Sequence, residues 1–107
     1  MMKEMLPEPW KRLVELMQSL NFGRITGLAV RAGQPDLAKG FRTVRTVKLP
    51  AGENGPRPEV RSANFDLRKE VMAMQDQMAA AADGAHLTIE VKHGLPFIVE
   101  IEQEHRA

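Results

Sequence analysis

The sequence predicts an α+β fold built from two α-β-β units (order αββαββ) that are related by a pseudo-twofold axis. The units share a four-stranded antiparallel sheet, and both helices lie on one face of it. Two stretches of helical periodicity are each followed by an alternating strand and a turn that contains Gly and Pro. A shift of 61 positions superposes them, matching Gly23 with Gly84 and Gly33 with Gly94. A chain of 107 residues forms one domain, because two would each be too small to bury a stable core. We therefore expect a single domain over residues 1–107.

The first unit, residues 9–49, is expected to begin with a helix. Pro9 suits the first helical turn, where its missing N–H costs nothing. Apolar residues follow at helical spacing, and they are Trp10, Leu13, Val14, Met17 and Leu20. Asn21 and Gly23 are residue types that close helices in a left-handed conformation, so the helix should end there.

Two strands should complete the first unit. Residues 24–31 alternate as a strand does, and their match to the second unit predicts which side chains face the core: Thr26, Leu28 and Val30. Residues 32–40 read as a long loop because they contain Ala-Gly-Gln-Pro. The β-branched stretch that follows predicts a second strand, which carries basic residues at Lys39, Arg42, Arg45 and Lys48.

The second unit, residues 62–103, follows a linker over residues 50–61, which hold three prolines and two glycines. Asn64 is the expected N-cap of its helix, which should run for about 18 residues to Asp83-Gly84. The apolar stripe of this helix consists of Leu67, Val71, Met74, Met78 and Ala81. A stripe of this kind is typical of packing against a sheet, although Met-rich faces also bind partners.

The hairpin within residues 84–103 is the best-specified part of the chain. Leu87, Ile89 and Val91 should share a face with Phe97, Val99 and Ile101. A three-residue loop over residues 94–96 meets this condition, because it sets the two apolar faces opposite each other. The pairs it predicts are Ile89 with Ile101, Val91 with Val99, Glu90 with Glu100, Thr88 with Glu102 and His86 with Glu104.

Composition narrows the possible functions. Cys is absent, which excludes disulfides, thiolate zinc sites and cysteine nucleophiles. No apolar run approaches the roughly 20 residues that span a bilayer, and the N-terminus does not resemble a signal peptide, so we expect a cytoplasmic protein without membrane contact. Residues 1–61 carry 11 basic and 6 acidic side chains, and residues 62–107 carry 4 and 8. Either the halves neutralise each other across the sheet, which we favour, or the first half meets an acidic partner.

The stretch from Leu13 to Lys48 resembles the small uncharacterised bacterial proteins of the YezD-like type. In that family a short helix leads to an aromatic-Gly pair, a strand, a Gly turn and a second strand that ends in basic residues. Phe22-Gly23, Gly33, Val44 and Lys48 stand at the corresponding places. The resemblance implies a bacterial protein built on a helix-strand-strand unit. It implies no activity, because the family has no settled one.

Catalysis has little support in the sequence. Ser19 and Ser62 are the only serines, and neither lies in a nucleophile-elbow context. His86 opposite Glu104 is a candidate pair of metal ligands, but a site needs a third ligand at a fixed spacing. We therefore expect no enzyme activity, no cofactor and no metal.

Two binding functions remain. The first is association with a second copy, as a dimer, or with another protein, through apolar residues expected on the open face of the sheet at Ile25, Ala29 and Ile98. The alternative is nucleic-acid binding through basic side chains at Arg24, Arg31, Lys39, Arg42, Arg45 and Lys48. The aromatic content of 5% leaves few platforms for stacking bases, so we favour the first.

Overall fold

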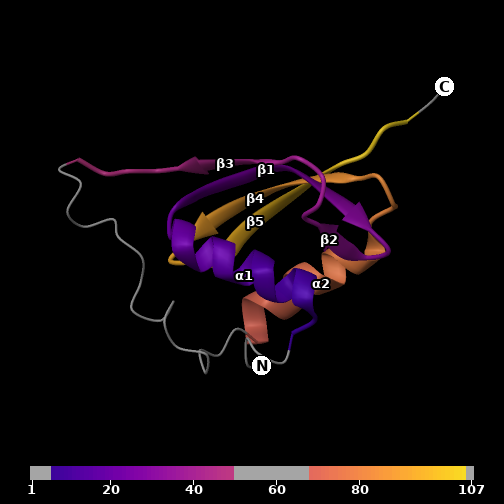
Figure 1. Cartoon of the computed structure of the whole chain (residues 1–107), viewed down its shortest axis with the longest axis horizontal. Helices are drawn as coiled ribbons and strands as arrows, with labels where there is room; N and C mark the ends of the chain where they lie inside the picture. The colour runs from indigo at the N-terminus through magenta and orange to yellow at the C-terminus, as the bar shows by residue number, and fades with distance from the viewer. Residues whose placement is uncertain (1–5, 50–67, 106–107) are drawn as a thin grey trace.

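The computed structural model describes residues 6–49 and 68–105, and it is an α+β fold with an antiparallel sheet, as predicted. Both helices lie on the same side of the sheet (Figure 1). The elements are α1 (Glu8–Leu20), β1 (Gly23–Arg31), β2 (Gln34–Asp36), β3 (Arg42–Arg45), α2 (Arg68–Ala80), β4 (His86–Lys92) and β5 (Leu95–Glu102). The predicted linker over residues 50–61, the N-cap Asn64 and the stripe residue Leu67 lie outside the described residues.

The sheet has five strands, so the predicted count of four is wrong. Its order is β2-β1-β4-β5, and β3 also pairs with β1. β3 lies along the first half of β1, where Gly23 is opposite Arg45, and β2 lies along the second half, where Arg31 is opposite Gln34. The two short strands thus share one edge of the sheet, and β5 forms the opposite edge.

The extra strand arises from a tight turn at the start of residues 32–40, which were predicted to form a long loop. Ala32 and Gly33 both have positive φ, 53° and 73°, as a type I′ turn requires. The twist of this turn matches that of the strands, so the chain reverses within two residues and forms β2. Only residues 37–41 then leave the sheet before β3 begins.

The second hairpin turns in the same way, which makes the predicted three-residue loop wrong. His93 and Gly94 have φ of 55° and 75°, and Lys92 is opposite Leu95. The apolar faces of β4 and β5 still lie opposite each other, because the register shifts by one residue between Glu90 and Val91 and not at the loop. Val91 pairs with Pro96 and Glu90 with Ile98, which leaves Phe97 as the extra residue of a β-bulge.

One continuous core fills the space between the helices and the sheet. The predicted stripe of α1 is confirmed, since all five of its apolar residues are buried. On α2, Val71, Met74 and Met78 are buried and Ala81 is partly buried, as predicted. β4 contributes Leu87, Ile89 and Val91, none more than 1% exposed.

β1 departs from the predicted alternation. The register shifts between Ile25 and Leu28, where Gly27 takes a φ of 73° that suits a bulge. Leu28 and Val30 are buried as predicted, but Thr26 is only half-buried and Ile25 is fully buried. The bulge reverses which residues point inward, so the first half of the strand has the opposite phase to the prediction.

Each hairpin turn touches the end of the helix from the other half of the chain. The Gly94 N–H donates to the Asn21 carbonyl oxygen at 3.0 Å, directly after α1. The Ala32 N–H donates to Asp83 Oδ1 at 2.9 Å, and Gly33 lies against Ala79 near the end of α2. These contacts fix both turns to the helical layer.

Candidate functional site

β5 forms one edge of the sheet. It pairs with β4 and, within residues 6–49 and 68–105, with no other strand. Pro96 fits this position, because proline lacks the N–H that an inner strand needs and is found at edges and bulges. Among the described residues, the backbone groups on the other side of β5 therefore have no strand partner.

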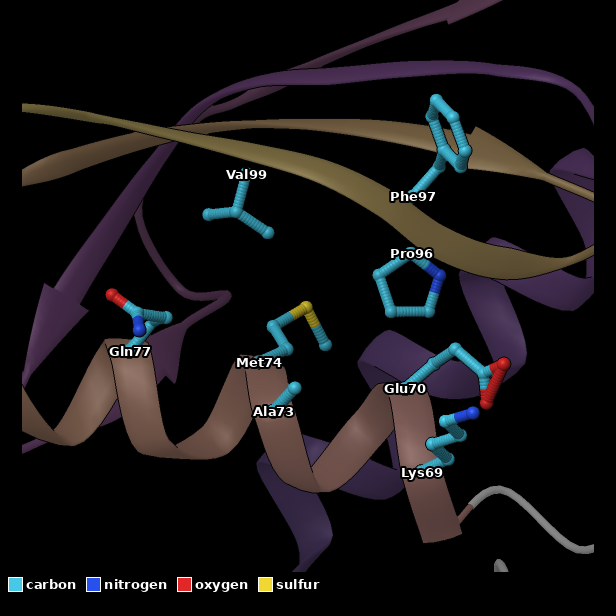
Figure 2. A pocket seen from close by; sticks show the side chains of 8 residues that line it. All are labelled: Lys69, Glu70, Ala73, Met74, Gln77, Pro96, Phe97 and Val99. Atoms are coloured by element: carbon cyan, nitrogen blue, oxygen red, sulfur yellow. The ribbon is translucent and has the colours of Figure 1, made fainter.

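A groove of about 360 Å³ runs between β5 and α2 (Figure 2). Met74, Pro96 and Val99 point into it, and Met74 and Pro96 are buried while Val99 is half-buried. Its rim is formed by Lys69, Glu70, Ala73 and Gln77, with Phe97 beside it. The groove thus combines an apolar floor with a polar rim, which is the usual arrangement of a binding cleft.

Phe97 points away from the helices, contrary to the prediction that it shares the core face (Figure 2). The bulge turns it outward, where it is 59% exposed and Lys92 Nζ lies 4.2 Å from its ring centroid. Val99 and Ile101 do share the inner face, opposite Ile89 and Leu87. The outer face of β5 therefore combines an aromatic ring with the carboxylates that follow it.

The cross-strand pairs differ from the predicted ones because the register is shifted, by three positions between the turn and the bulge and by two positions beyond the bulge. Ile89 faces Val99 instead of Ile101, and Val91 faces Pro96 instead of Val99. On the outer face the pairs are Glu90 with Ile98, Thr88 with Glu100 and His86 with Glu102. The repulsion expected between Glu90 and Glu100 is avoided, since no two glutamates are directly opposite each other in this hairpin.

The three residues predicted for self-association do not share a surface. Ile25 is in the core and fully buried, so the prediction that it lies on the open face is wrong. Ala29 pairs with Asp36 and His86 and is only 3% exposed, so it offers little apolar surface. Ile98 alone is open, at 44% exposure, and it lies on β5.

The six basic residues predicted for nucleic-acid binding are all exposed, but they do not form one surface. Arg24 and Arg42 lie on the outer face of the neighbouring strands β1 and β3. Arg45 points to the helical side, where its Nη2 donates to the Ser19 carbonyl oxygen at 3.5 Å. Arg31 is at the far end of β1, and the remaining two, Lys39 and Lys48, flank β3 on either side.

The charged side chains of β3 and β5 lie at opposite edges of the sheet, and between these edges Arg24 of β1 lies opposite Glu90 of β4. The basic strand β3 pairs with β1, so β1 and β4 separate it from β5 with its Glu100 and Glu102. The interpretation that β3 lies beside the second hairpin and neutralises it is therefore wrong. One edge of the sheet is basic and the other is acidic.

A metal site would have to involve His86, which lies opposite Glu102 and not opposite Glu104 as predicted. All three residues border a shallow hollow at the end of the second hairpin. In the portion of the chain that the structure describes, no three His, Asp or Glu residues are grouped to hold a metal ion.

The groove was not predicted from the sequence, because the favoured interpretation places both Met74 and Val99 in the core. Pro96 was the available signal, since a proline inside an apolar strand indicates an edge or a bulge. The pair formed by Lys92 and Phe97 was also missed, because it depends on the bulge that moves the ring outward.

No protein-family model, curated protein or solved structure matches the chain. The resemblance of residues 13–48 to YezD-like proteins therefore stays a prediction. Among the described helices, neither is long and apolar enough to cross a lipid bilayer.

Proposed function

We propose that this is a small, non-catalytic bacterial protein of the cytoplasm that binds a second copy of itself or another protein through the β5 edge. The observation that carries the proposal is the position of β5, an eight-residue strand with a free side next to an apolar groove. A free strand edge is a template for a further strand, and a neighbouring groove selects its side chains. Ile98 and Ile101, 44% and 39% exposed, add apolar surface there.

The test is the mass of the full chain in solution, measured by light scattering after gel filtration over a wide range of concentrations. We expect a mass above that of the monomer, with a dimer as the smallest assembly. Ile98→Lys should shift the protein towards monomer, because it places a charge on the proposed contact. A wild-type protein that stays monomeric at high concentration would contradict self-association.

We also propose that the two halves of the chain are repeats of one unit. The turns at Ala32-Gly33 and His93-Gly94 stand 61 positions apart, and both residues of each turn have positive φ. Each turn contacts the end of the other half's helix, as a twofold relation requires. In this interpretation β2 and β3 together correspond to β5.

Nucleic-acid binding is the second candidate. It is supported by the exposure of Arg24 and Arg42 on adjacent strands of the outer face and by the aromatic ring of Phe97 on the same face. Fluorescence anisotropy with a single-stranded and a duplex oligonucleotide tests it. Binding that falls as salt rises, and that Arg42→Ala weakens, would support it, because phosphate contacts release counterions. No binding at low salt would reject it.

A further inference from the structure

An extended arm leaves the sheet after β3. The Thr46 N–H donates to the Phe22 carbonyl oxygen at 2.9 Å, and the chain then runs past the start of β1, away from the body of the protein (Figure 1). Residues 46–49 form this arm. Val47 and Leu49 on it are 47% and 82% exposed. Leaving two branched apolar side chains in water forgoes the gain that burial would bring.

The side chains of the arm should alternate between the two faces of the sheet. Arg45 is on the helical side, as its hydrogen bond to Ser19 shows. Since neighbouring residues of an extended chain point in opposite directions, Val47 and Leu49 continue on the helical side and Lys48 falls on the outer side.

The free edge of β5 presents the complementary pattern. Val99 and Ile101 lie on the helical side, opposite Ile89 and Leu87, and Val99 borders the groove beneath β5 (Figure 2). Glu100 lies on the outer side, opposite Thr88. On the helical side, β5 thus offers two apolar side chains, Val99 at the groove and Ile101 beyond it, to the two apolar side chains of the arm. On the outer side it offers a carboxylate to the amine of Lys48.

Strand directions also agree. β3 and β5 run in opposite directions, because β3 is antiparallel to β1, β1 to β4, and β4 to β5. Consider a second copy placed in the same orientation beside the first. Its arm continues its β3 and is therefore antiparallel to β5 of the first copy. The helical sides of the two copies then lie on the same face of the joined sheet. The sheet can extend from one copy to the next without a change of hand or face.

We infer that the arm over residues 46–49 of one copy adds to the β5 edge of a second copy. Leu49 lies opposite Val99, Lys48 opposite Glu100 and Val47 opposite Ile101. This inference rests on the proposed self-association and specifies its contact. Because the arm and the acceptor edge lie on opposite sides of the sheet, the contact is heterologous and continues into rings or open chains instead of stopping at a twofold dimer.

The decisive experiment mixes two charge-reversed variants of the full chain, Lys48→Glu and Glu100→Lys, and measures mass against concentration. Each variant alone should associate roughly tenfold more weakly than wild type, because every contact then joins like charges. In the mixture, the arm of each variant meets an edge of opposite charge on the other. We expect the mixture to recover wild-type association within about twofold.

Two matched variants control for net charge and folding. Lys39→Glu and Asp76→Lys reverse exposed charges away from the arm and from β5, so they should associate as wild type does. Leu49→Ser should weaken association roughly tenfold, whereas Met72→Ser, at a residue 45% exposed on α2, should not. Circular dichroism and the melting temperature of each variant confirm that it is folded.

The outcomes separate the inference from the function that it refines. A wild-type protein that never exceeds the monomer mass contradicts both the arm contact and the proposed self-association. Association that Lys48→Glu and Leu49→Ser leave unchanged overturns the arm contact alone. Loss of association in Glu100→Lys but not in Lys48→Glu overturns it in favour of pairing between two β5 edges. Loss in both single variants with recovery in the mixture establishes it.

Discussion

The two hairpins of this sheet reverse direction in the same way and then differ. Both turn through two residues of positive φ, at Ala32-Gly33 and at His93-Gly94. In the first hairpin the outer strand is broken into β2 and β3 by the excursion over residues 37–41, and in the second the outer strand β5 continues through a one-residue bulge. The turn therefore sets the start of a hairpin, and the irregularity that follows decides whether its edge is short and divided or long and open.

The difference has consequences for each edge. At the divided edge, β2 and β3 pair with the two halves of β1, and the chain after β3 leaves the sheet as the arm. The continuous edge keeps eight residues in line and moves Phe97 to the outer face. Natural sheets protect long edges with charges and prolines, and β5 carries both in Glu100, Glu102 and Pro96. The charges and the proline that oppose unspecific strand pairing still allow pairing with a strand that carries a positive charge opposite Glu100.

The largest expected effect on stability distinguishes an isoleucine of the first hairpin, Ile25, from one of the second, Ile98. Ile25→Ala should lower the free energy of unfolding by about 2–5 kcal/mol, because the side chain is fully buried and its removal leaves a cavity. Ile98→Ala should cost less than about 1 kcal/mol, since Ile98 is 44% exposed. Urea denaturation followed by circular dichroism measures both. Equal losses would mean that the bulge in β1 does not place Ile25 in the core.

Much of the fold could be predicted from the sequence, because helical and alternating periods report burial directly. The apolar stripe of α1, its end at Asn21 and the inner face of β4 all followed from such periods. Single-residue irregularities could not be predicted in this way. The bulges at Gly27 and Phe97 each change the phase of a strand and therefore the face of the residues on one side of them. The turn at Ala32-Gly33 begins a strand where a loop was predicted.

The candidate site was harder to predict for the same reason. Of the residues proposed for self-association, Ile98 lies on an exposed edge while Ile25 falls in the core, and a bulge in each strand decides the outcome. The separation of charge also depends on strand order, which pairs β3 with β1 and away from β5. Strand order is a property of the whole sheet and leaves no local signal in the sequence.

The next effect tests the turn of the first hairpin. Gly33→Ala should cost about 1–2 kcal/mol, because φ is 73° and a Cβ would lie 3.3 Å from Ala79 Cα on α2. Gly40→Ala is the control, since that position has open space for a Cβ within the same hairpin, and it should be neutral or slightly stabilising. Thermal unfolding of both variants gives the comparison, and a Gly33→Ala protein as stable as wild type would contradict the turn.

A smaller effect distinguishes how the two turns are held. The first turn is held through the bond from the Ala32 N–H to Asp83 Oδ1. The second turn is held by the backbone carbonyl of Asn21 and by the ring of His93, whose centroid lies 4.8 Å from that of Phe22. Asp83→Ala should therefore cost about 1 kcal/mol and loosen only the first hairpin. Amide hydrogen exchange followed by NMR should show faster exchange at Ala32 and no change at Gly94. Equal acceleration at both amides would mean that the two hairpins open together.

The smallest effect concerns the outer face of the second hairpin. Lys92→Gln removes the charge that lies 4.2 Å from the ring centroid of Phe97 and should cost about 0.5 kcal/mol, because the pair is exposed. The double variant with Phe97→Leu measures the coupling, since the loss should vanish once the aromatic ring is gone. A coupling near zero would mean that the bulge alone holds Phe97 outward. In that case the open edge of β5 depends on the backbone of the hairpin and not on this pair.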